Sequence, residues 1–117
     1  MKRIYVAGAY SADNVLDVLK NIGMGEQICS DLFSMGYAPF CPWHDKGYVI
    51  SDPYRSYTVQ QFYDYSIAWL KVSDAMFLVR GWEDSTGTLA EIAVANKLGI
   101  RQFMHYSELE KWREEND

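Results

Sequence analysis

The sequence predicts one α/β domain over residues 1–117, with three layers (α/β/α) and a parallel sheet of about four strands in the flavodoxin-like order 2-1-3-4. Short apolar runs alternate along the chain with longer stretches of helical periodicity, which is typical of strand–helix–strand units. The run at 75–79 is apolar throughout, like a central strand buried on both faces. With 117 residues, 49% of them hydrophobic, the chain has enough apolar mass for a single core.

The first part of the chain predicts two strands, one long helix and one loop. In order, they span 4–7 (strand), 15–33 (helix), 37–40 (strand) and 41–54 (loop). Asn14 or Asp13 can cap the helix, and Gly36 follows its last turn, where a glycine commonly stands. Gly23 and Gly25 inside the helix predict a local weakness or kink. The loop contains two prolines and is long for a compact domain, which is typical of functional loops.

The second part predicts three helices, two strands and one turn. The first helix ends at about residue 72. It is followed by a strand over 75–79, a turn over 81–87, a helix over 89–98, a strand over 101–104 and a helix from 107 onward. Ser56 or Thr58 can cap the first of these helices, and Gly99 ends the second. Ser107 and Glu110 have the spacing of a capping box for the last helix.

Three segments are predicted to meet at the ligand-binding edge of the sheet. Ligands bind such sheets beyond the carboxyl ends of the strands, where the strand order reverses, and this rule selects 8–14, 41–54 and 80–91. In the first segment, small residues let the backbone approach a ligand, and Ser11 offers a hydroxyl. An ordinary capped turn explains that segment equally well.

The segment before the 89–98 helix combines hydroxyl groups with a carboxylate. Ser85, Thr86 and Thr88, together with free N–H groups at the helix start, can hold an anion. Glu91, about one turn into the helix, is a candidate nucleophile or base. Thr88 and Glu91 also have capping-box spacing, and spacing alone favours that structural explanation.

The 41–54 segment holds Cys41, His44 and Asp45, a combination that occurs in metal sites. No second ligand pair has zinc spacing, so we expect no metal and no cofactor, and His44 is a polar pocket-wall residue or an ordinary loop histidine. Aromatic rings near the same edge can stack on a planar base or can cover the sheet edge; they are Trp43, Tyr48, Tyr54 and Trp82.

Composition restricts the partners and the compartment. A net charge of −5 argues against binding nucleic acid through charge alone. No apolar run approaches the ~20 residues of a membrane span, and the first residues lack the apolar core of a signal peptide. Two cysteines are too few for a disulfide framework, which favours a cytoplasmic location. Aromatic residues make up 15% of the chain and predict an aromatic pocket or a subunit interface.

Several motifs together resemble the nucleoside 2-deoxyribosyltransferase superfamily, especially its small phage and bacterial members of undetermined role, and also the nucleoside 5′-monophosphate N-glycosidases. The resemblance covers most of residues 3–104. It is carried by IYVAGAYS at 4–11, WL at 69–70, SDA at 73–75, GWEDSTGTLAE at 81–91, Ala95, and LG at 98–99.

The resemblance implies a catalytic glutamate and a small-molecule nucleoside or nucleotide substrate. In this superfamily the residue matching Glu91 attacks the anomeric carbon of the sugar, the one matching Tyr5 orients it, and the loop after the first strand faces the sugar and any phosphate. Base-exchanging members carry an aspartate six residues before the nucleophile, whereas hydrolases of 5′-monophosphates carry a serine, here Ser85. The expected substrate-binding residues are Gly8, Ala9, Tyr10, Ser11, His44, Ser66, Trp82, Asp84, Ser85 and Gly87.

One position departs from the superfamily pattern. Members usually carry an aspartate that helps to protonate the leaving base, and here that position holds Ser66. Asp64 is two residues earlier, ~200° away around a helix, so it does not simply substitute. Asp84, Asp45 and His44 remain as alternative proton donors.

Two functions therefore follow from the sequence. The first is an N-glycosidase or 2-deoxyribosyltransferase acting on a nucleoside or nucleoside 5′-monophosphate, and the alternative is a non-catalytic nucleotide-binding protein that uses the same pocket. The resemblance also implies a homodimer or higher homo-oligomer, because superfamily members complete their sites with a neighbouring subunit.

Overall fold

Four parallel strands form one sheet in the order β2-β1-β3-β4, which confirms the predicted fold class. The structure is a computed structural model that describes residues 1–117. Strand β1 (Arg3–Ala7) lies between β2 (Ala38–Phe40) and β3 (Ala75–Leu78), and β4 (Gln102–Phe103) extends the sheet beyond β3. The strand order reverses between β1 and β3, so the carboxyl edge of these two strands is where a ligand is expected.

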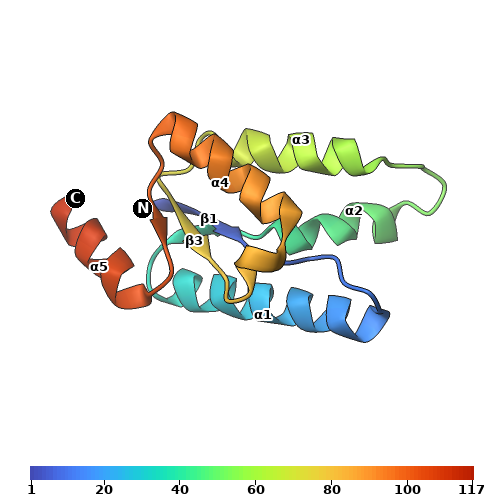
Figure 1. Cartoon of the computed structure of the whole chain (residues 1–117), viewed down its shortest axis with the longest axis horizontal. Coiled ribbons are helices and arrows are strands. Elements are labelled where there is room, and N and C mark those ends of the chain that lie inside the picture. Colours follow the sequence, from blue (N-terminus) through green and yellow to red (C-terminus); the bar gives the residue numbers. More distant parts are fainter.

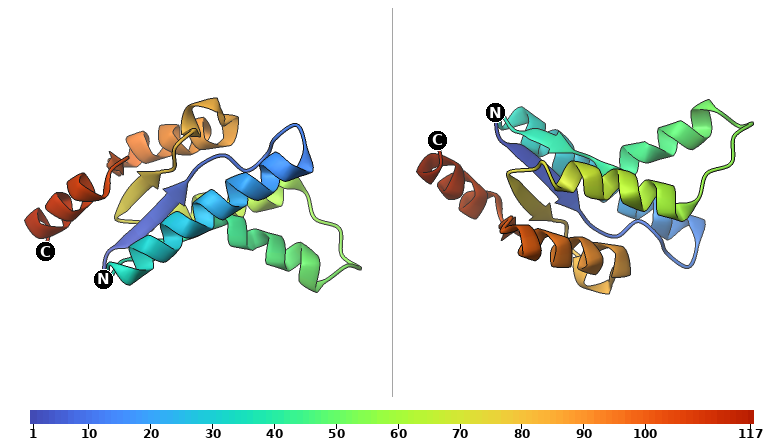
Figure 2. Two further views of the ribbon diagram at one scale, coloured as in Figure 1. Left: turned by 90° about the horizontal axis from the view of Figure 1, so that it is seen from below. Right: turned by 90° about the horizontal axis from the view of Figure 1, so that it is seen from above.

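Helices cover both faces of the sheet (Figures 1 and 2). The four long helices are α1 (Val15–Ser34), α3 (Val59–Leu70), α4 (Thr86–Leu98) and α5 (Tyr106–Glu115). Helices α1 and α5 pack on the face that carries Ile4 and Val6, whereas α3 and α4 pack on the face that carries Tyr5 and Ala7. This division follows from the alternation of side chains along a strand. None of the helices is both long and apolar enough to cross a membrane.

Helix α1 begins and ends where the sequence predicts. The Asn14 side chain caps it by accepting a hydrogen bond from the Asp17 N–H at 2.9 Å. Gly36 follows the helix with φ of +94°, a conformation that other residues adopt at a cost. Helix α1 runs unbroken through Gly23 and Gly25, so neither glycine ends it.

The prediction of an irregular loop over 41–54 is wrong for most of its length. The segment forms the short 3-10 helix η1 (Pro42–Asp45) and then α2 (Lys46–Ser51). Pro42 suits the first position of η1, where a missing N–H costs nothing. Trp43 anchors the segment, because its indole is only 1% exposed and donates a hydrogen bond to the Ala9 carbonyl at 3.1 Å.

Two predicted capping boxes are wrong. Helix α4 starts at Thr86, and its cap is Ser85, whose Oγ accepts a hydrogen bond from the Thr88 N–H at 3.2 Å. Thr88 therefore lies inside the helix and forms no capping box with Glu91. Helix α5 starts at Tyr106 without a side-chain cap.

The acidic member of the second box, Glu110, is engaged elsewhere. It accepts a hydrogen bond from the Tyr37 hydroxyl at 2.6 Å and pairs with Arg113. Thr58, by contrast, caps α3 as predicted and forms a capping box with Gln61. Helix α3 then ends at Leu70, slightly before the predicted end.

Candidate functional site

A cavity of about 540 Å³ opens at the carboxyl edge of the sheet. It lies among the loop after β1, η1 with α2, α3 and α4, toward the right-hand end of the molecule in Figure 1. The lining residues are Gly8, Tyr10, Ser11, Pro42, Trp43, Asp45, Lys46, Val49, Ile50, Val59, Phe62, Tyr63, Ser66 and Glu91. Half of them are hydrophobic, and a few polar groups converge among them, as in small-molecule sites.

Glu91 lines this cavity, and Tyr5 contacts Glu91 from outside the lining. The Tyr5 hydroxyl donates a hydrogen bond to the Glu91 carboxylate. Tyr5 is fully buried on the central strand β1, where its ring stacks on Phe40 with the ring centroids 5.4 Å apart. Glu91 projects from the first half of α4. A strand and a helix that are both fixed in the core therefore hold the pair.

Burial governs the ionisation of both groups. It raises the pKa of Glu91 to about 7, and the hydrogen bond from Tyr5 partly offsets this effect. Burial, followed by the Glu91 charge, raises the pKa of Tyr5 far above its usual range, so the phenol stays protonated and remains a donor. A carboxylate with a pKa near neutrality can act as a nucleophile or transfer a proton at neutral pH.

Ser66 lies behind this pair on α3. Its side chain is 8% exposed and lines the cavity. Hydrogen bonding with the Ser66 hydroxyl lowers the pKa of Tyr5, opposing the effect of burial. Ser66 on α3 and Glu91 on α4 therefore line the same cavity, and both influence the ionisation of Tyr5 on β1.

Asp45 and Tyr10 form a second polar pair in the same cavity. Burial raises the pKa of Asp45, and hydrogen bonding with Tyr10 lowers it in part. The pKa of Tyr10 rises to about 12, first through burial and then through the charge and hydrogen bonding of Asp45. The neighbouring Lys46 ammonium is bound elsewhere, to Glu26 at 3.1 Å and to the Trp43 carbonyl at 3.2 Å.

The structure brings some of the predicted site residues into the cavity and leaves others outside its lining. Gly8, Tyr10, Ser11, Ser66 and Glu91 line it. Seven predicted residues lie outside the lining: Tyr5, Ala9, His44, Trp82, Asp84, Ser85 and Gly87. Tyr5 contacts Glu91, and the Ala9 carbonyl accepts the hydrogen bond from Trp43.

The residues outside the lining have other surroundings. His44 points to the Glu26 carboxylate at 3.2 Å and borders a separate groove along β2. Trp82 and Asp84 belong to the 3-10 turn η2 (Trp82–Asp84), where Trp82 packs against the core beneath α4 and Asp84 is exposed. Ser85 caps α4. No group of three His, Cys, Asp or Glu side chains is arranged to hold a metal ion.

An apolar wall of the cavity was not foreseen. It is formed by Val49 and Ile50 on α2 and by Val59, Phe62 and Tyr63 on α3. No local signal announced this wall, because the adjacent β-branched residues at 49–50 favour a strand rather than the helix that forms.

The aromatic residues selected from the sequence lie in different surroundings. Trp43 lines the cavity but is nearly covered, whereas Tyr54 is 96% exposed. Tyr48 contacts Tyr65 in the groove along β2. Phe62 and Tyr63 supply the aromatic wall of the cavity instead.

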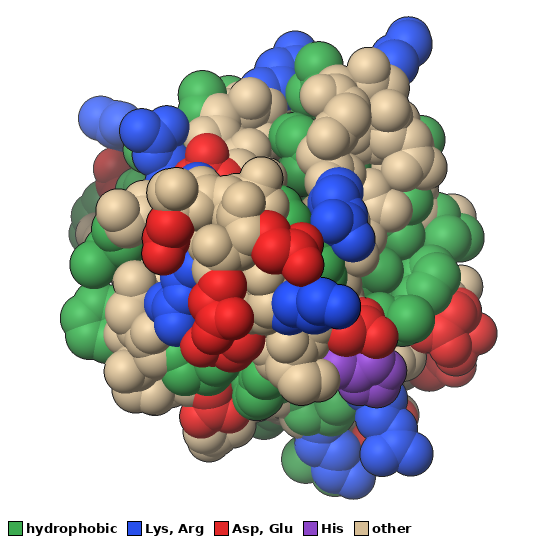
Figure 3. All heavy atoms as spheres, turned by 90° about the vertical axis from the view of Figure 1, so that its left-hand side faces the viewer, with side chains coloured by type: hydrophobic (Ala, Val, Ile, Leu, Met, Phe, Trp, Pro, Cys, Tyr) green, Lys and Arg blue, Asp and Glu red, His purple; other side chains and the backbone are tan.

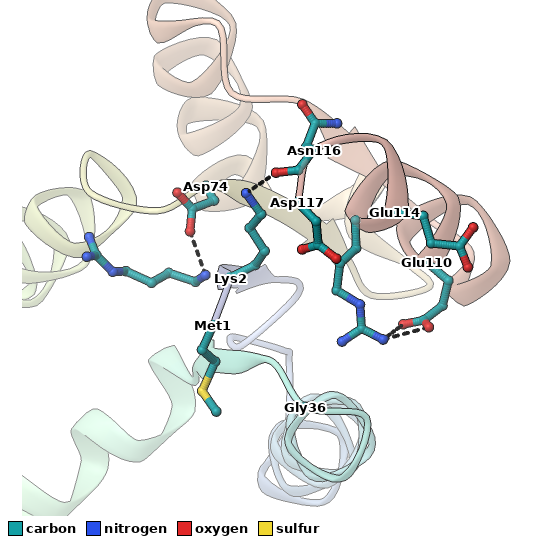
Figure 4. Close-up of a pocket in the computed structure, with 10 residues that line it drawn as sticks. Met1, Lys2, Gly36, Asp74, Glu110, Glu114, Asn116 and Asp117 are labelled. Carbon is teal, nitrogen blue, oxygen red and sulfur yellow. Dashed lines mark hydrogen bonds and ion pairs between the residues drawn. The ribbon is translucent and has the colours of Figure 1, made fainter.

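A second cavity, of about 790 Å³, lies at the opposite end of the sheet and has a different character. Side chains of both charges are mixed on this face (Figure 3), and in the cavity Arg113 pairs with Glu110 while other charged side chains bind backbone groups (Figure 4). The Lys2 ammonium donates to the Asn116 carbonyl at 2.7 Å, and the Arg3 N–H donates to the Asp74 carboxylate at 2.7 Å. These contacts tie β1 to neighbouring segments, which is a structural role.

Comparison with known proteins identifies the family. No curated protein matches the chain. Residues 43–103, just over half of the chain, match the family described as "Domain of unknown function (DUF4406)". The matched segment contains Asp45, Ser66 and Glu91 but leaves out β1, so Tyr5 lies outside it. The chain belongs to the DUF4406 family.

Proposed function

We propose that this protein is an N-glycosidase of the 2-deoxyribosyltransferase type, which cleaves the N-glycosidic bond of a nucleoside or nucleoside 5′-monophosphate. One observation carries the proposal: a partly buried glutamate, Glu91, lines a cavity of about 540 Å³ at the carboxyl edge of the sheet and accepts a hydrogen bond from the Tyr5 hydroxyl. The resemblance described from the sequence implies the same two residues in these roles.

The chemistry suits a buried carboxylate. Cleavage of an N-glycosidic bond passes through an oxocarbenium-like state, which a carboxylate below the sugar ring stabilises. The Glu91 carboxylate attacks the anomeric carbon while the bond to the base breaks, and the base leaves with the electron pair and takes up a proton. Water or a second base then attacks the same carbon and releases Glu91. The choice between these two acceptors separates a hydrolase from a transferase.

The proposal favours a nucleotide over a nucleoside. Ser85 caps α4, six residues before Glu91 on the same helix. A neutral hydroxyl beside helix N–H groups tolerates a phosphate, whereas a carboxylate there would repel it.

The proposed assembly is a homodimer or a larger homo-oligomer. Val15, Leu16 and Leu19 lie exposed on the first turns of α1, directly after the loop that carries Gly8 and Ser11. A second copy that covered this apolar face would remove it from water and lie beside the cavity mouth. The proposed compartment is the cytoplasm, where the two free buried thiols of Cys29 and Cys41 would stay reduced.

The test is base release measured together with thermal stability. The four deoxynucleoside 5′-monophosphates and their nucleosides are incubated with the wild type and with Glu91→Gln, and free base is quantified. We expect wild-type release and a loss of several orders of magnitude in the variant, which keeps the size and hydrogen bonding of the side chain. Glu83→Gln, an exposed change in η2, serves as the matched control. A Glu91→Gln variant that melts normally and turns over at the wild-type rate refutes the assignment.

The arrangement of Ser66 favours a second candidate, a non-catalytic nucleotide-binding protein. Where the superfamily carries an acid, this chain has a hydroxyl that is engaged with Tyr5. In this case nucleotides raise the melting temperature of the wild type, and no base is released from any of them.

A further inference from the structure

Two carboxyl groups line the cavity, those of Asp45 and Glu91. They come from separate elements, because Asp45 stands at the junction of η1 and α2 whereas Glu91 projects from α4. The two carboxyl groups therefore face one cavity from different sides of the chain fold, and the Tyr5 hydroxyl is bound to Glu91 alone. Most glycoside hydrolases break a glycosidic bond with a pair of carboxyl groups, of which one acts on the sugar and the other transfers protons.

No fixed cation neutralises the Asp45 carboxyl group. Asp45 forms no ion pair and does not cap α2 with its side chain. Lys46, the nearest ammonium along the chain, is occupied by Glu26 and by a backbone carbonyl. Hydrogen bonding with Tyr10, the Lys46 charge and hydrogen bonding with the Lys46 backbone each lower the pKa of Asp45 in part. Burial favours the neutral acid and outweighs the opposing charge of Lys46, so the pKa of Asp45 is raised above its usual value.

The other residues considered as proton donors are placed less well. His44 faces Glu26 and borders the groove along β2. Asp84 is exposed on η2 and does not line the cavity. Asp64 is exposed on α3, where it accepts a hydrogen bond from Gln60 at 2.8 Å. The Ser66 hydroxyl is a far weaker acid than a carboxyl group.

We propose that Asp45 is the general acid that protonates the departing base, an inference that rests on the function proposed for Glu91. As the bond between the anomeric carbon and the base nitrogen breaks, its electron pair goes to the base, and the Asp45 carboxyl proton moves to the base. Glu91 is left bonded to the anomeric carbon. A water molecule then attacks that carbon, its proton returns to the Asp45 carboxylate, and the Glu91 carboxylate is released, so that one water is consumed for each bond broken.

The apolar wall supports this role. Val49 and Ile50 stand on α2, the helix that begins directly after Asp45, and Phe62 faces the same cavity from α3. A planar base that lies against this wall would bring its edge toward the chain segment that carries Asp45. The low polarity of the wall would strengthen a hydrogen bond between the acid and the base nitrogen.

The experiment measures kcat/KM as a function of pH for the deoxynucleoside 5′-monophosphate that the wild type cleaves fastest. Asp45→Asn removes the transferable proton and keeps the shape, and we expect a loss of roughly 100- to 10,000-fold. We also expect the decline of the wild-type rate at alkaline pH to disappear, because Asn does not titrate. Asp45→Glu, which keeps the acid, should retain more activity than Asp45→Asn. Asp64→Asn is the matched control and should behave like the wild type.

Each outcome of this experiment supports or overturns the role proposed for Asp45. An Asp45→Asn variant within about threefold of the wild type overturns the inference, and so does a slow variant that keeps the wild-type pH profile, which would indicate a structural role. If Asp45→Asn does not fold, the test uses Asp45→Glu instead. Activity of the Asp45→Glu variant that is no higher than background then overturns the inference. Base release that depends on Glu91 but not on Asp45 leaves the proposed function intact, whereas no release from any nucleotide overturns both.

Discussion

The indole of Trp43 packs directly against the backbone of Gly25, so that a Cβ atom on this glycine would lie 2.5 Å from the indole carbons. The same indole donates a hydrogen bond to the Ala9 carbonyl. Trp43 thereby joins α1, η1 and the loop after β1, three segments that surround the candidate site. The glycine that looks like a weak point in the helix is the position that lets this ring approach.

Gly25→Ala should destabilise the protein. Overpacking of this kind typically costs about 1–3 kcal/mol, which exceeds the ~1 kcal/mol gained from the better helix propensity of alanine. Gly23→Ala is the matched control, because nothing lies within 4 Å of a Cβ there and the change should be neutral or stabilising. Urea unfolding of the two variants measures the difference. A Gly25→Ala variant as stable as Gly23→Ala contradicts the packing described.

The stability contributed by Glu91 should fall as pH rises. Its folded pKa of about 7 lies above the ~4.3 of an unfolded glutamate, so the folded state holds the proton more tightly. The stabilisation is complete below the unfolded pKa and is lost as pH rises through 7. The free energy of unfolding of the wild type, relative to Glu91→Gln, should therefore drop by on the order of 3 kcal/mol between pH 5 and pH 8. Denaturant titrations at both pH values test this, and a constant difference contradicts it.

Tyr5→Phe should slow catalysis and move its pH dependence. The variant loses the hydrogen bond that holds and stabilises the Glu91 carboxylate, a bond to a charged group worth about 1.5–3 kcal/mol. We expect kcat to fall by roughly 10- to 100-fold. The pKa of Glu91 should rise further, because burial is then no longer offset, so the acidic limb of the pH–rate profile should shift to higher pH. A slower variant with an unmoved limb would show that Tyr5 acts on folding alone.

Ser85→Asp should separate binding of nucleotides from binding of nucleosides. Aspartate caps helices as well as serine does, so the melting temperature should be maintained. The added charge should weaken binding of a 5′-monophosphate more than binding of the free nucleoside, by like-charge repulsion. Calorimetric titration of both ligands into the wild type and the variant measures this. Equal losses would place Ser85 away from the phosphate.

The proposed self-association should be visible in solution. Sedimentation at tens of micromolar, a rough scale for a stable homo-oligomer, should show a dimer or a larger species. Leu16→Glu, on the exposed apolar face of α1, should shift the protein toward monomer without lowering its melting temperature. A wild type that sediments only as a monomer refutes the proposal.

Patterns that depend on a single element predicted the fold well. The continuous apolar run at 75–79 located the central strand β3, and Asn14 and Gly36 marked both ends of α1. These signals are local, because buried strands and helix caps are specified by adjacent residues. The strand order followed from the alternation of elements and the handedness of their connections.

Features that depend on contacts distant in sequence were not predictable in this way. The helix α2 forms within a stretch marked by prolines, because Trp43 anchors that stretch on Gly25 from another element. The capping box predicted for Thr88 and Glu91 failed for a local reason, because Ser85 caps α4 and places Thr88 inside the helix. Glu91 was selected from the sequence, but its contact with Tyr5, 86 residues away, followed only from the resemblance.

The reactive pair and the apolar wall of the cavity come from separate segments of the chain. Tyr5 and Glu91 stand on β1 and α4, whereas the apolar wall stands on α2 and the start of α3, which are joined by an exposed turn over 52–58. Figure 1 shows these two helices reaching beyond the sheet. Substitutions in the wall would leave the Tyr5–Glu91 pair undisturbed. Relatives could therefore diverge in the molecules they select while inheriting the same reactive centre.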